Sequence, residues 1–151
     1  MADKDAFDLK IIAPDRIFYE GKVEFVEFNT SEGERGILKN HAPETLVLEP
    51  GLVKIYEADD LTNSGSSVQS GNEKSSSVKK GVIHGGFAEI LKDRVTILAE
   101  IAEWPDEIDL RRAEEAKIRA ERRINTEGEG IDMDRAEASL RRALARIDSL
   151  K

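Results

Sequence analysis

Apolar and polar residues alternate along much of the first hundred positions, a pattern typical of β-strands with one buried face. The alternation is clear over residues 7–11, and over residues 22–28 it changes phase, as in a bulged strand. Further strands are predicted over residues 37–38, 44–48, 52–56, 79–83, 87–91 and 94–99. Turn residues separate them, among them Pro14-Asp15 and a tight turn bracketed by Gly33 and Gly36. Short strands at this spacing predict an antiparallel β-sandwich or barrel.

After Pro105 the apolar positions recur every three to four residues, which indicates two helices. The predicted apolar stripes are Leu110, Ala113, Ala116, Ala120 and Ile124 in the first helix, and Met133, Ala136, Leu140, Ala143, Leu144 and Ile147 in the second. The short Gly-rich segment 125–130 between them makes the helices antiparallel neighbours. The predicted fold class is therefore α+β, with an antiparallel β-sandwich domain over residues 1–104 and a helical hairpin domain over residues 105–151.

Alanine dominates both stripes, so the hairpin is expected to bury little apolar area per residue. Full burial of a leucine contributes roughly 1.5–3 kcal/mol, and few such side chains are available here. A hairpin of this kind should be marginal alone and either lean on another surface or exchange partners, as a conformational switch does. A hairpin that simply stays docked is the alternative.

Residues 59–77 are rich in Ser, Gly and Asn and show no apolar period. Ordering such a segment costs about 1–2 kcal/mol of backbone entropy per residue with little burial in return. We therefore expect a long, flexible connection inserted into the sandwich domain. No aromatic or charged cluster marks it as a binding loop.

The composition narrows the classes of function. The chain of 151 residues has a formal net charge of −8, so its surface as a whole should repel nucleic acid and anionic membranes. It contains no cysteine, which excludes disulfides, thiolate catalysis and cysteine-based zinc sites. We find no secretory signal and no apolar run long enough to span a bilayer. The expectation is a soluble protein that meets a membrane only indirectly, through a partner.

No active site is evident in the sequence. His41 and His84 lack the HxH or HExxH spacing of metal sites. No nucleophile elbow, no distinctive pair of carboxylates and no phosphate-binding loop is recognisable. We therefore expect no catalytic residues, no metal site and no required cofactor, and an enzyme is the least favoured class.

Four arginines form two pairs on the predicted helices. At about 100° per residue, Arg112 and Arg119 nearly eclipse on the first helix, and Arg142 and Arg146 share a face of the second. Two such pairs can converge across a hairpin, and guanidinium groups match the oxygens of a polyphosphate in geometry and charge. The alternative is a solvated face with ion pairs such as that of Glu115 with Arg119, each contributing about 0.2–0.5 kcal/mol.

Several motifs in the chain are shared with a known family. They are Ser31-Glu32-Gly33-Glu34-Arg35-Gly36-Ile37-Leu38-Lys39-Asn40-His41-Ala42-Pro43, Pro14-Asp15 with Phe18-Tyr19-Glu20-Gly21, Gly85-Gly86-Phe87-Ala88-Glu89-Ile90 and Val95-Thr96-Ile97-Leu98-Ala99. With the order of a β-rich domain and a two-helix hairpin, they make the chain resemble the epsilon subunit of the bacterial F-type ATP synthase over essentially its whole length. The sequence departs from the family pattern at Arg35, at Lys39-Asn40 and in the length of segment 59–77.

The resemblance implies a non-catalytic rotor subunit that serves ATP synthesis and proton transport, bound peripherally at the cytoplasmic face of the cell membrane. The sandwich would contact the gamma subunit and the ring of c subunits, with Glu32, Glu34 and His41 at the contact. The hairpin would either fold down on the sandwich or extend into the catalytic head of alpha and beta subunits, where it inhibits ATP hydrolysis. Its expected contacts to acidic residues of the head come from Arg135, Arg141, Arg142 and Arg146.

Some members of this family bind ATP between the sandwich and the folded hairpin, through the pattern Ile/Leu-Asp-x-x-Arg-Ala. The stretch Ile108-Asp109-Leu110-Arg111-Arg112-Ala113 matches that pattern. The ATP site that the resemblance implies consists of Glu103, Ile108, Asp109, Arg112, Ala113, Arg119, Arg142 and Arg146. In it the arginines hold the phosphates, while Glu103, Ile108 and Asp109 hold the base and ribose. ATP, alone or with Mg²⁺, would be a regulatory ligand that stabilises the folded hairpin.

Helix capping is the alternative interpretation of this hexapeptide. An aspartate before a helix contributes about 0.5–2 kcal/mol as an N-cap, and Asp109 has that position. The same pattern recurs at Ile131-Asp132-Met133-Asp134-Arg135-Ala136. A second functional hypothesis also stays open, namely a free-standing ATP-sensing module that uses the hairpin without a rotary motor. Binding to gamma would distinguish the two hypotheses.

Overall fold

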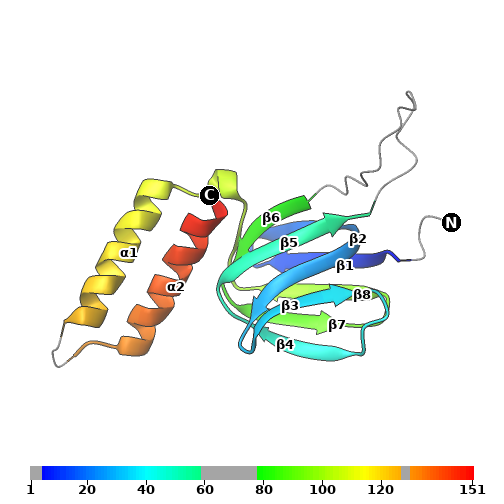
Figure 1. Ribbon diagram of the computed structural model, residues 1–151, viewed down its shortest axis with the longest axis horizontal. Helices are drawn as coiled ribbons and strands as arrows, with labels where there is room; N and C mark the ends of the chain where they lie inside the picture. The colour runs from blue at the N-terminus through cyan, green and yellow to red at the C-terminus, as the bar shows by residue number, and fades with distance from the viewer. Residues whose placement is uncertain (1–4, 59–77, 127–129) are drawn as a thin grey trace.

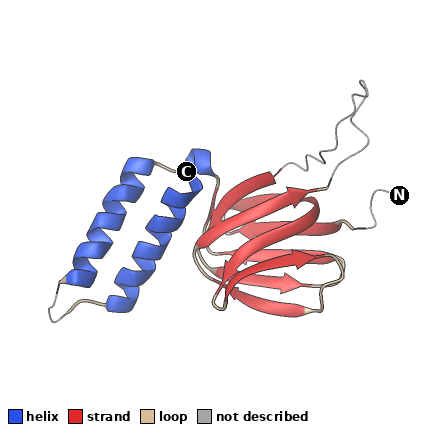
Figure 2. Ribbon diagram, in the orientation of Figure 1, coloured by secondary structure: helices blue, strands red, loops and turns tan. Residues whose placement is uncertain are grey.

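The computed structural model describes residues 5–58, 78–126 and 130–151. Within them, the chain forms a β-sandwich followed by a pair of antiparallel helices that stand beside it (Figure 1). Figure 2 shows that strands and helices are fully segregated into these two parts. The predicted fold class is confirmed. The segment 59–77, predicted to be a flexible connection, lies outside the described residues.

The sandwich is one continuous sheet folded round on itself. Its strands are β1 (Phe7–Ala13), β2 (Arg16–Thr30), β3 (Gly33–Leu38), β4 (Glu44–Leu48), β5 (Gly51–Glu57), β6 (Val78–Ile83), β7 (Gly86–Ile90), β8 (Arg94–Ala99) and β9 (Ala102–Glu103). They are ordered β1-β8-β7-β4-β2-β5-β6-β9, and β2 also pairs with β1 and β3. The first half of β2 pairs with β1, and its second half pairs with β3 and β5. The long β2 therefore passes from one layer of the sandwich to the other.

One strand pair departs from the antiparallel arrangement predicted from the sequence. Strands β1 and β8 run parallel, with Leu9 beside Val95 and Ile11 beside Ile97. The remaining strand pairs of the described sheet are antiparallel. A period of two reports which face a residue occupies but not the direction of the neighbouring strand, so the alternation had no means of revealing this pair.

The tight turn predicted between Gly33 and Gly36 is wrong. Residues 33–38 form β3, which pairs with residues 25–30 of β2. The turn lies one step earlier, at Ser31-Glu32. Gly33 follows it with φ of +112°, a conformation that residues with a side chain rarely adopt. Gly36 is extended and leaves room for the ring of Phe25, which would meet an added Cβ at 2.5 Å.

Large apolar side chains fill the space between the layers. The fully buried ones are Phe7, Leu9, Ile11, Val23, Val26, Phe28, Ile37, Val53, Ile55, Val82, Ile90 and Ile97. The ring of Trp104 stacks on Phe18 at the edge of this core, with centroids 4.1 Å apart. The core thus extends to the point where the chain leaves the sandwich for the helices.

The hairpin begins after a short 3-10 turn, η1 (Pro105–Glu107), and consists of α1 (Leu110–Asn125) and α2 (Met133–Ser149). Asp109 and Asp132 cap the two helices, because their carboxylates accept hydrogen bonds from the backbone N–H groups of Arg112 and Arg135. The capping interpretation of the repeated hexapeptide is thereby confirmed. Within the described residues, no helix combines the length and apolar content that crossing a bilayer requires.

The buried positions of α1 and α2 are all alanines, namely Ala113, Ala120, Ala136, Ala143 and Ala145. Three larger members of the predicted stripes are instead exposed: Leu110, Met133 and Leu144. Where alanine faces alanine, two helix backbones approach closely, and longer side chains are left at the margins of the contact. The apolar stripe was therefore predicted wider than the seam that the helices bury.

Only one helix makes the main contact with the sandwich. Helix α2 lies between α1 and the strands, and it packs on β5 and β6 (Figure 1). Helix α1 packs chiefly on α2. Of the two helices, α2 therefore makes the direct contact of the hairpin with the sandwich.

Candidate functional site

A two-pronged ion pair joins α2 to the sandwich. The guanidinium of Arg146 donates from Nε to Oε2 of Glu103 at 2.8 Å and from Nη2 to Oε1 at 2.9 Å. Glu103 belongs to β9, whose backbone pairs with Val82 of β6. Both side chains are about three-quarters shielded from solvent, and a bidentate pair of this kind is stronger than a single exposed contact. We call this pair the Glu103–Arg146 clamp.

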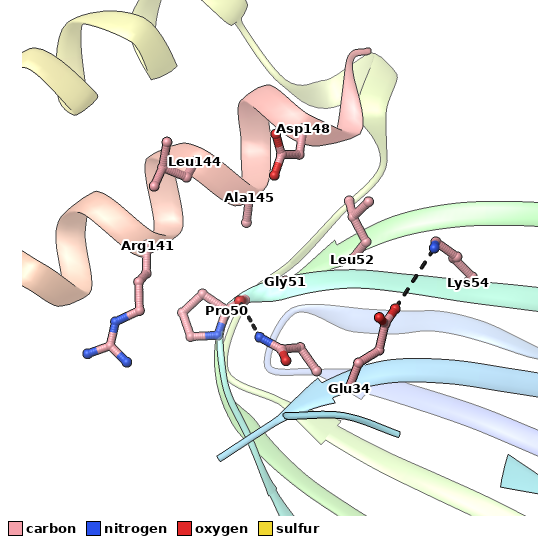
Figure 3. Close-up of a pocket in the computed structure, with 10 residues that line it drawn as sticks. Glu34, Pro50, Gly51, Leu52, Lys54, Arg141, Leu144, Ala145 and Asp148 are labelled. Carbon is pink, nitrogen blue, oxygen red and sulfur yellow. Dashed lines mark hydrogen bonds and ion pairs between the residues drawn. The ribbon is translucent and has the colours of Figure 1, made fainter. Parts of the chain in front are cut away.

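A second, looser contact lies nearer the N-terminus of α2. Arg141 reaches Glu49 at 3.3 Å, and its side chain is half exposed. Beside it, a groove of about 340 Å³ runs between α2 and the turn from β4 to β5. Figure 3 shows Ala145 pointing from α2 toward Pro50 and Gly51 across this groove. Small residues on both sides leave room for the helix to lie close to the turn.

His84 lies directly behind the Glu103–Arg146 clamp. It follows β6, its side chain is fully buried, and its Nε2 lies 3.3 Å from Oε2 of Glu103. An ionised carboxylate only accepts hydrogen bonds, so Nε2 carries the proton and donates. The opposite ring nitrogen, Nδ1, is buried without a hydrogen-bond partner among the described residues.

Burial and the neighbouring charges together fix the ionisation of His84 and Glu103. Burial lowers the pKa of His84, and the guanidinium groups of Arg146 and Arg142 lower it further, which together outweigh the opposing effect of Glu103. Burial alone would raise the pKa of Glu103, but hydrogen bonds from Arg146 and His84 bring that pKa below its ordinary value. At neutral pH the site holds a carboxylate anion and a neutral imidazole.

A third ion pair anchors the linker that leads into α1. Arg16 on β2 donates to both carboxylate oxygens of Glu107, at 2.7 and 2.6 Å. The hydrogen bond from Arg16 lowers the pKa of Glu107, and Glu107 also accepts from the backbone N–H of Trp104. The start of the hairpin is therefore held on the sandwich independently of α2.

Only some of the residues predicted to bind ATP lie close together in the structure. Glu103 and Arg146 are in contact, and Arg142 lies close enough to His84 to affect its ionisation while it donates to Ser139 Oγ at 3.2 Å. On α1, Arg112 and Arg119 are exposed and form no ion pair with the described residues. The remaining predicted residues are Ile108, half-buried after η1, Asp109, the N-cap, and Ala113, buried in the seam.

The alternative interpretation of these arginines was a solvated face with an ion pair between Glu115 and Arg119, and the structure shows a different pairing. Glu115 pairs with Arg111, at 3.2 Å, and not with Arg119. Both pairings have helical spacing, so the sequence did not distinguish them. Arg112 and Arg119 remain exposed on the surface of α1.

The residues predicted to contact the c-ring and gamma lie along β3 rather than in one loop. Glu32 is exposed in the turn before β3, and Glu34 is on β3, 3.9 Å from Lys54. His41 lies beyond the other end of the strand, where its Nδ1 is 2.7 Å from the carbonyl oxygen of Ala42. Six extended residues span about 20 Å, so His41 lies far from Glu32.

The arginines predicted to contact the catalytic head have different roles in this docked hairpin. Arg141 and Arg146 are engaged with Glu49 and Glu103 of the sandwich. Arg142 bonds within α2, and the side chain of Arg135 is exposed near the N-terminus of that helix. The second helix therefore uses two of these four arginines to hold the folded-down position.

The structure also has an exposed apolar surface that was not predicted from the sequence. Adjacent strands place five apolar residues in a row across the outside of the sandwich: Val47, Phe87, Leu98, Ile12 and Ile17. Four of them are more than half exposed and Ile12 is partly buried. We call them the apolar row. A contiguous exposed apolar patch marks an interaction site, and its sequence signal was that these strands carry apolar residues on both faces.

Comparison with known proteins places this architecture. A family model described as the beta-sandwich domain of the ATP synthase delta/epsilon chain matches residues 6–105, and one for the long alpha-helix domain of the same chain matches residues 106–151. The ATP synthase epsilon chain of Halalkalibacterium halodurans is 42% identical over 141 residues, which cover 93% of each chain. That of Clostridium novyi is 40% identical over 142 residues, covering 94% of this chain and 95% of the relative.

Solved structures share the fold. A chain in a cryo-EM structure of the Euglena gracilis mitochondrial ATP synthase, comprising OSCP, F1 and c-ring, superimposes with a TM-score of 0.76 at 21% identity. The match covers 97% of this chain and 82% of that one. A sandwich with a docked helical hairpin and matching sequence over both parts defines the class: the chain belongs to the ATP synthase delta/epsilon chain family. Its bacterial relatives are named as the epsilon chain, a non-catalytic subunit of ATP synthase.

Proposed function

We propose that this chain is a rotor subunit in the central stalk of an F-type ATP synthase at the cytoplasmic face of the membrane. In this role the sandwich joins gamma to the c-ring, and the hairpin regulates the motor by inhibiting ATP hydrolysis when it leaves the sandwich. Membership of the family supports the stalk role. The observation that carries the regulatory part is the Glu103–Arg146 clamp, because it holds the hairpin through groups that another charged surface can replace.

The apolar row is the proposed gamma contact. It lies on the outer faces of β4, β7, β8, β1 and β2, where the described residues leave it exposed. Burial of apolar surface supplies roughly 25 cal/mol per Å², so covering the row with a partner surface is favourable. Glu32, Glu34 and His41 are the proposed polar contacts toward the c-ring.

A gamma-binding assay tests this part of the proposal. Phe87→Glu introduces a charge into the row, and we expect it to weaken capture of gamma by at least about tenfold, since a buried unpaired charge is costly. Ile118→Glu makes the same type of change at an exposed residue of α1 and should leave capture unchanged. Equal binding by both variants would contradict the proposed contact.

The hairpin is proposed to exchange partners because α2 is attached to the sandwich by two ion pairs and not by a large apolar core. Arg146 and Arg141 hold α2 to carboxylates of the sandwich. Acidic residues of a catalytic head would offer the same arginines equivalent partners, together with Arg135 and Arg142. Because the buried residues of the two helices are alanines, little apolar burial is lost when the helices separate.

ATP is the proposed ligand of the folded hairpin. The exposed guanidinium groups of Arg112 and Arg119 on α1 lack ion-pair partners in the described structure, and Arg142 and Arg146 lie on α2. A triphosphate bridging the two helices would neutralise these four cations. Since Arg146 is bonded to Glu103, engaging the phosphates requires the clamp to rearrange and releases the Glu103 carboxylate for the base side of the nucleotide.

Isothermal titration of the full chain with ATP at pH 8 tests nucleotide binding. We expect saturable heat at millimolar nucleotide or below, weakened more than about tenfold in the double variant Arg112→Gln, Arg142→Gln, because each charged hydrogen bond contributes about 1.5–3 kcal/mol. Arg122→Gln, an exposed arginine of α1 outside the predicted site, is the matched control. Absence of saturable heat in the parent chain would rule out the ATP site.

A further inference from the structure

His84 is a buried titratable group for which the proposed function has no role. Its imidazole is completely enclosed at the junction of the sandwich with α2, yet neither the predicted ATP site nor the predicted contacts include it. It touches the Glu103–Arg146 clamp from the sandwich side. A change in the charge of His84 therefore changes the electrostatic energy of the contact that holds α2.

Charged groups face this imidazole from both parts of the molecule. Glu103 on β9 accepts from Nε2, and the guanidinium groups of Arg142 and Arg146 face it from α2. On the adjoining turn, the carboxylate of Glu100 lies beside Gly85. The sandwich thus contributes the negative charge at the ring, while α2 contributes the two positive charges.

A second proton has no suitable place on the docked ring. It would reside on Nδ1, which is buried and has no acceptor among the described residues. A buried donor without a partner is costly, and the new cation would lie against two guanidinium groups. The docked arrangement therefore suits only the neutral imidazole.

We propose that His84 makes the docking of α2 sensitive to pH, because protonation of its buried imidazole adds a third cation beside Arg142 and Arg146 and favours release of the helix. The regulatory meaning of this release rests on the proposed function. The docking equilibrium itself belongs to the isolated chain and requires neither nucleotide nor gamma.

The direction of the pH effect on docking follows from the linkage between protonation of His84 and docking of α2. In the docked state, burial and the two arginines lower the pKa of His84. Release of α2 removes both arginines and opens the ring to solvent, so the pKa returns toward its ordinary value of about 6.5. The released state then binds the proton more tightly, and falling pH favours release. The neutral imidazole of His84 makes its full contribution to docking above about pH 6.5, and this contribution is lost as the pH falls below that value. Each pH unit between the two pKa values changes the docked-to-released ratio about tenfold.

Fluorescence energy transfer in the full chain, without nucleotide, tests the proposal. Because the chain has no cysteine, dyes are placed at Glu20→Cys on β2 and Glu114→Cys on α1, both exposed positions. Energy transfer should fall as the pH decreases from 8 to 5. His84→Gln retains a donor near the position of Nε2 but does not titrate, and it should lose most of this pH dependence. His41→Gln, the other histidine, should behave like the parent.

Direct titration of the ring provides a measurement that does not depend on the His84 variant docking normally. The imidazole signals of the two histidines are followed by NMR in the parent chain and in Arg146→Gln. We expect the pKa of His84 to rise in the variant. An unchanged pKa, or a pH profile of energy transfer that is the same in parent and His84→Gln, would overturn the proposal.

The two proposals fail separately. Nucleotide titration at pH 8 is done where His84 is neutral, so an absence of ATP heat there contradicts the ATP site and leaves the pH dependence standing. A flat pH profile with normal ATP binding contradicts only the role of His84.

Discussion

The sandwich and the hairpin are stabilised in different ways. The sandwich encloses phenylalanine, isoleucine, leucine and valine side chains that are almost completely buried, whereas the buried residues of the helices are all alanines. The sandwich is closed by strand pairing along its length, whereas α2 meets it through the Glu103–Arg146 clamp, the Arg141–Glu49 pair and a small apolar contact. The difference separates a part held by a large apolar core from a part held largely by ion pairs.

Because of this difference, mutations in the sandwich core and mutations at the junction should have different energetic effects. A large side chain removed from a core leaves a cavity and loses several kcal/mol. If the proposed function holds, a change at the junction instead shifts an equilibrium between positions of a folded element. Substitutions in the two parts should therefore differ in kind as well as in size.

The largest effect is expected in the sandwich core. Phe28→Ala removes an almost fully buried ring and should lower the free energy of unfolding by about 3–5 kcal/mol. Urea unfolding followed by the fluorescence of Trp104, the one tryptophan of the chain, measures the change. A loss below about 1 kcal/mol would mean that the core is not what stabilises the sandwich.

Overpacking the helical seam should have a smaller and local effect. Ala143 is almost fully buried between the helices, and Ala143→Leu should weaken their contact by about 1–3 kcal/mol while the unfolding of the sandwich is unchanged. Circular dichroism follows the helices and Trp104 fluorescence follows the sandwich. Ala116→Leu, at a partly exposed position of α1, is the control. Coincident loss of both signals would contradict the independence of the two parts.

The clamp should contribute more than the exposed ion pair. Arg146→Gln leaves the partly buried Glu103 carboxylate without its main partner, and we expect a shift of about 1–2 kcal/mol away from docking. Arg141→Gln removes a half-exposed single contact and should change docking by less than about 1 kcal/mol. Energy transfer between the sandwich and α1 measures both. Equal effects would show that the bidentate geometry is unimportant.

A small effect is expected at alkaline pH within the sandwich. Burial, assisted by the charge of Glu57, raises the pKa of Tyr19 to about 12. The unfolded chain loses this proton near pH 10, so the stabilisation is present below pH 10 and is lost as the pH rises toward 12. Thermal melts at pH 9 and 11 should show a larger decrease for the parent than for Tyr19→Phe. The same decrease in both would assign the effect to other groups.

Much of the sandwich followed from the period of its apolar residues. The strands β4 and β8 were predicted with their observed bounds, since alternation and flanking turns both pointed to them. The parallel pairing of β1 with β8 was not predictable, because side-chain alternation is the same for either direction. The short β9 was missed, since two residues are too few to show a period.

The site was less predictable than the fold, because it depends on which helix faces the sandwich. Glu103 and Arg146 were singled out as ATP residues through the family resemblance, yet their contact with each other depends on the docking of α2. Asp109 was recognised as a possible cap, and its hydrogen bond to the N–H of Arg112 follows from local geometry. His84 gave no sequence signal, because its role comes from burial at a junction of distant segments.

Native-state hydrogen exchange of the full chain, with and without ATP, tests most directly whether the hairpin is held by exchangeable contacts. Amides of α1 and α2 should exchange through an opening that requires much less free energy than the opening of β1 and β8, and saturating ATP should slow the helices alone. If the helices exchanged only together with the sandwich strands, and ATP changed nothing, the hairpin would be a fixed part of the folded core and its proposed regulatory movement would be contradicted.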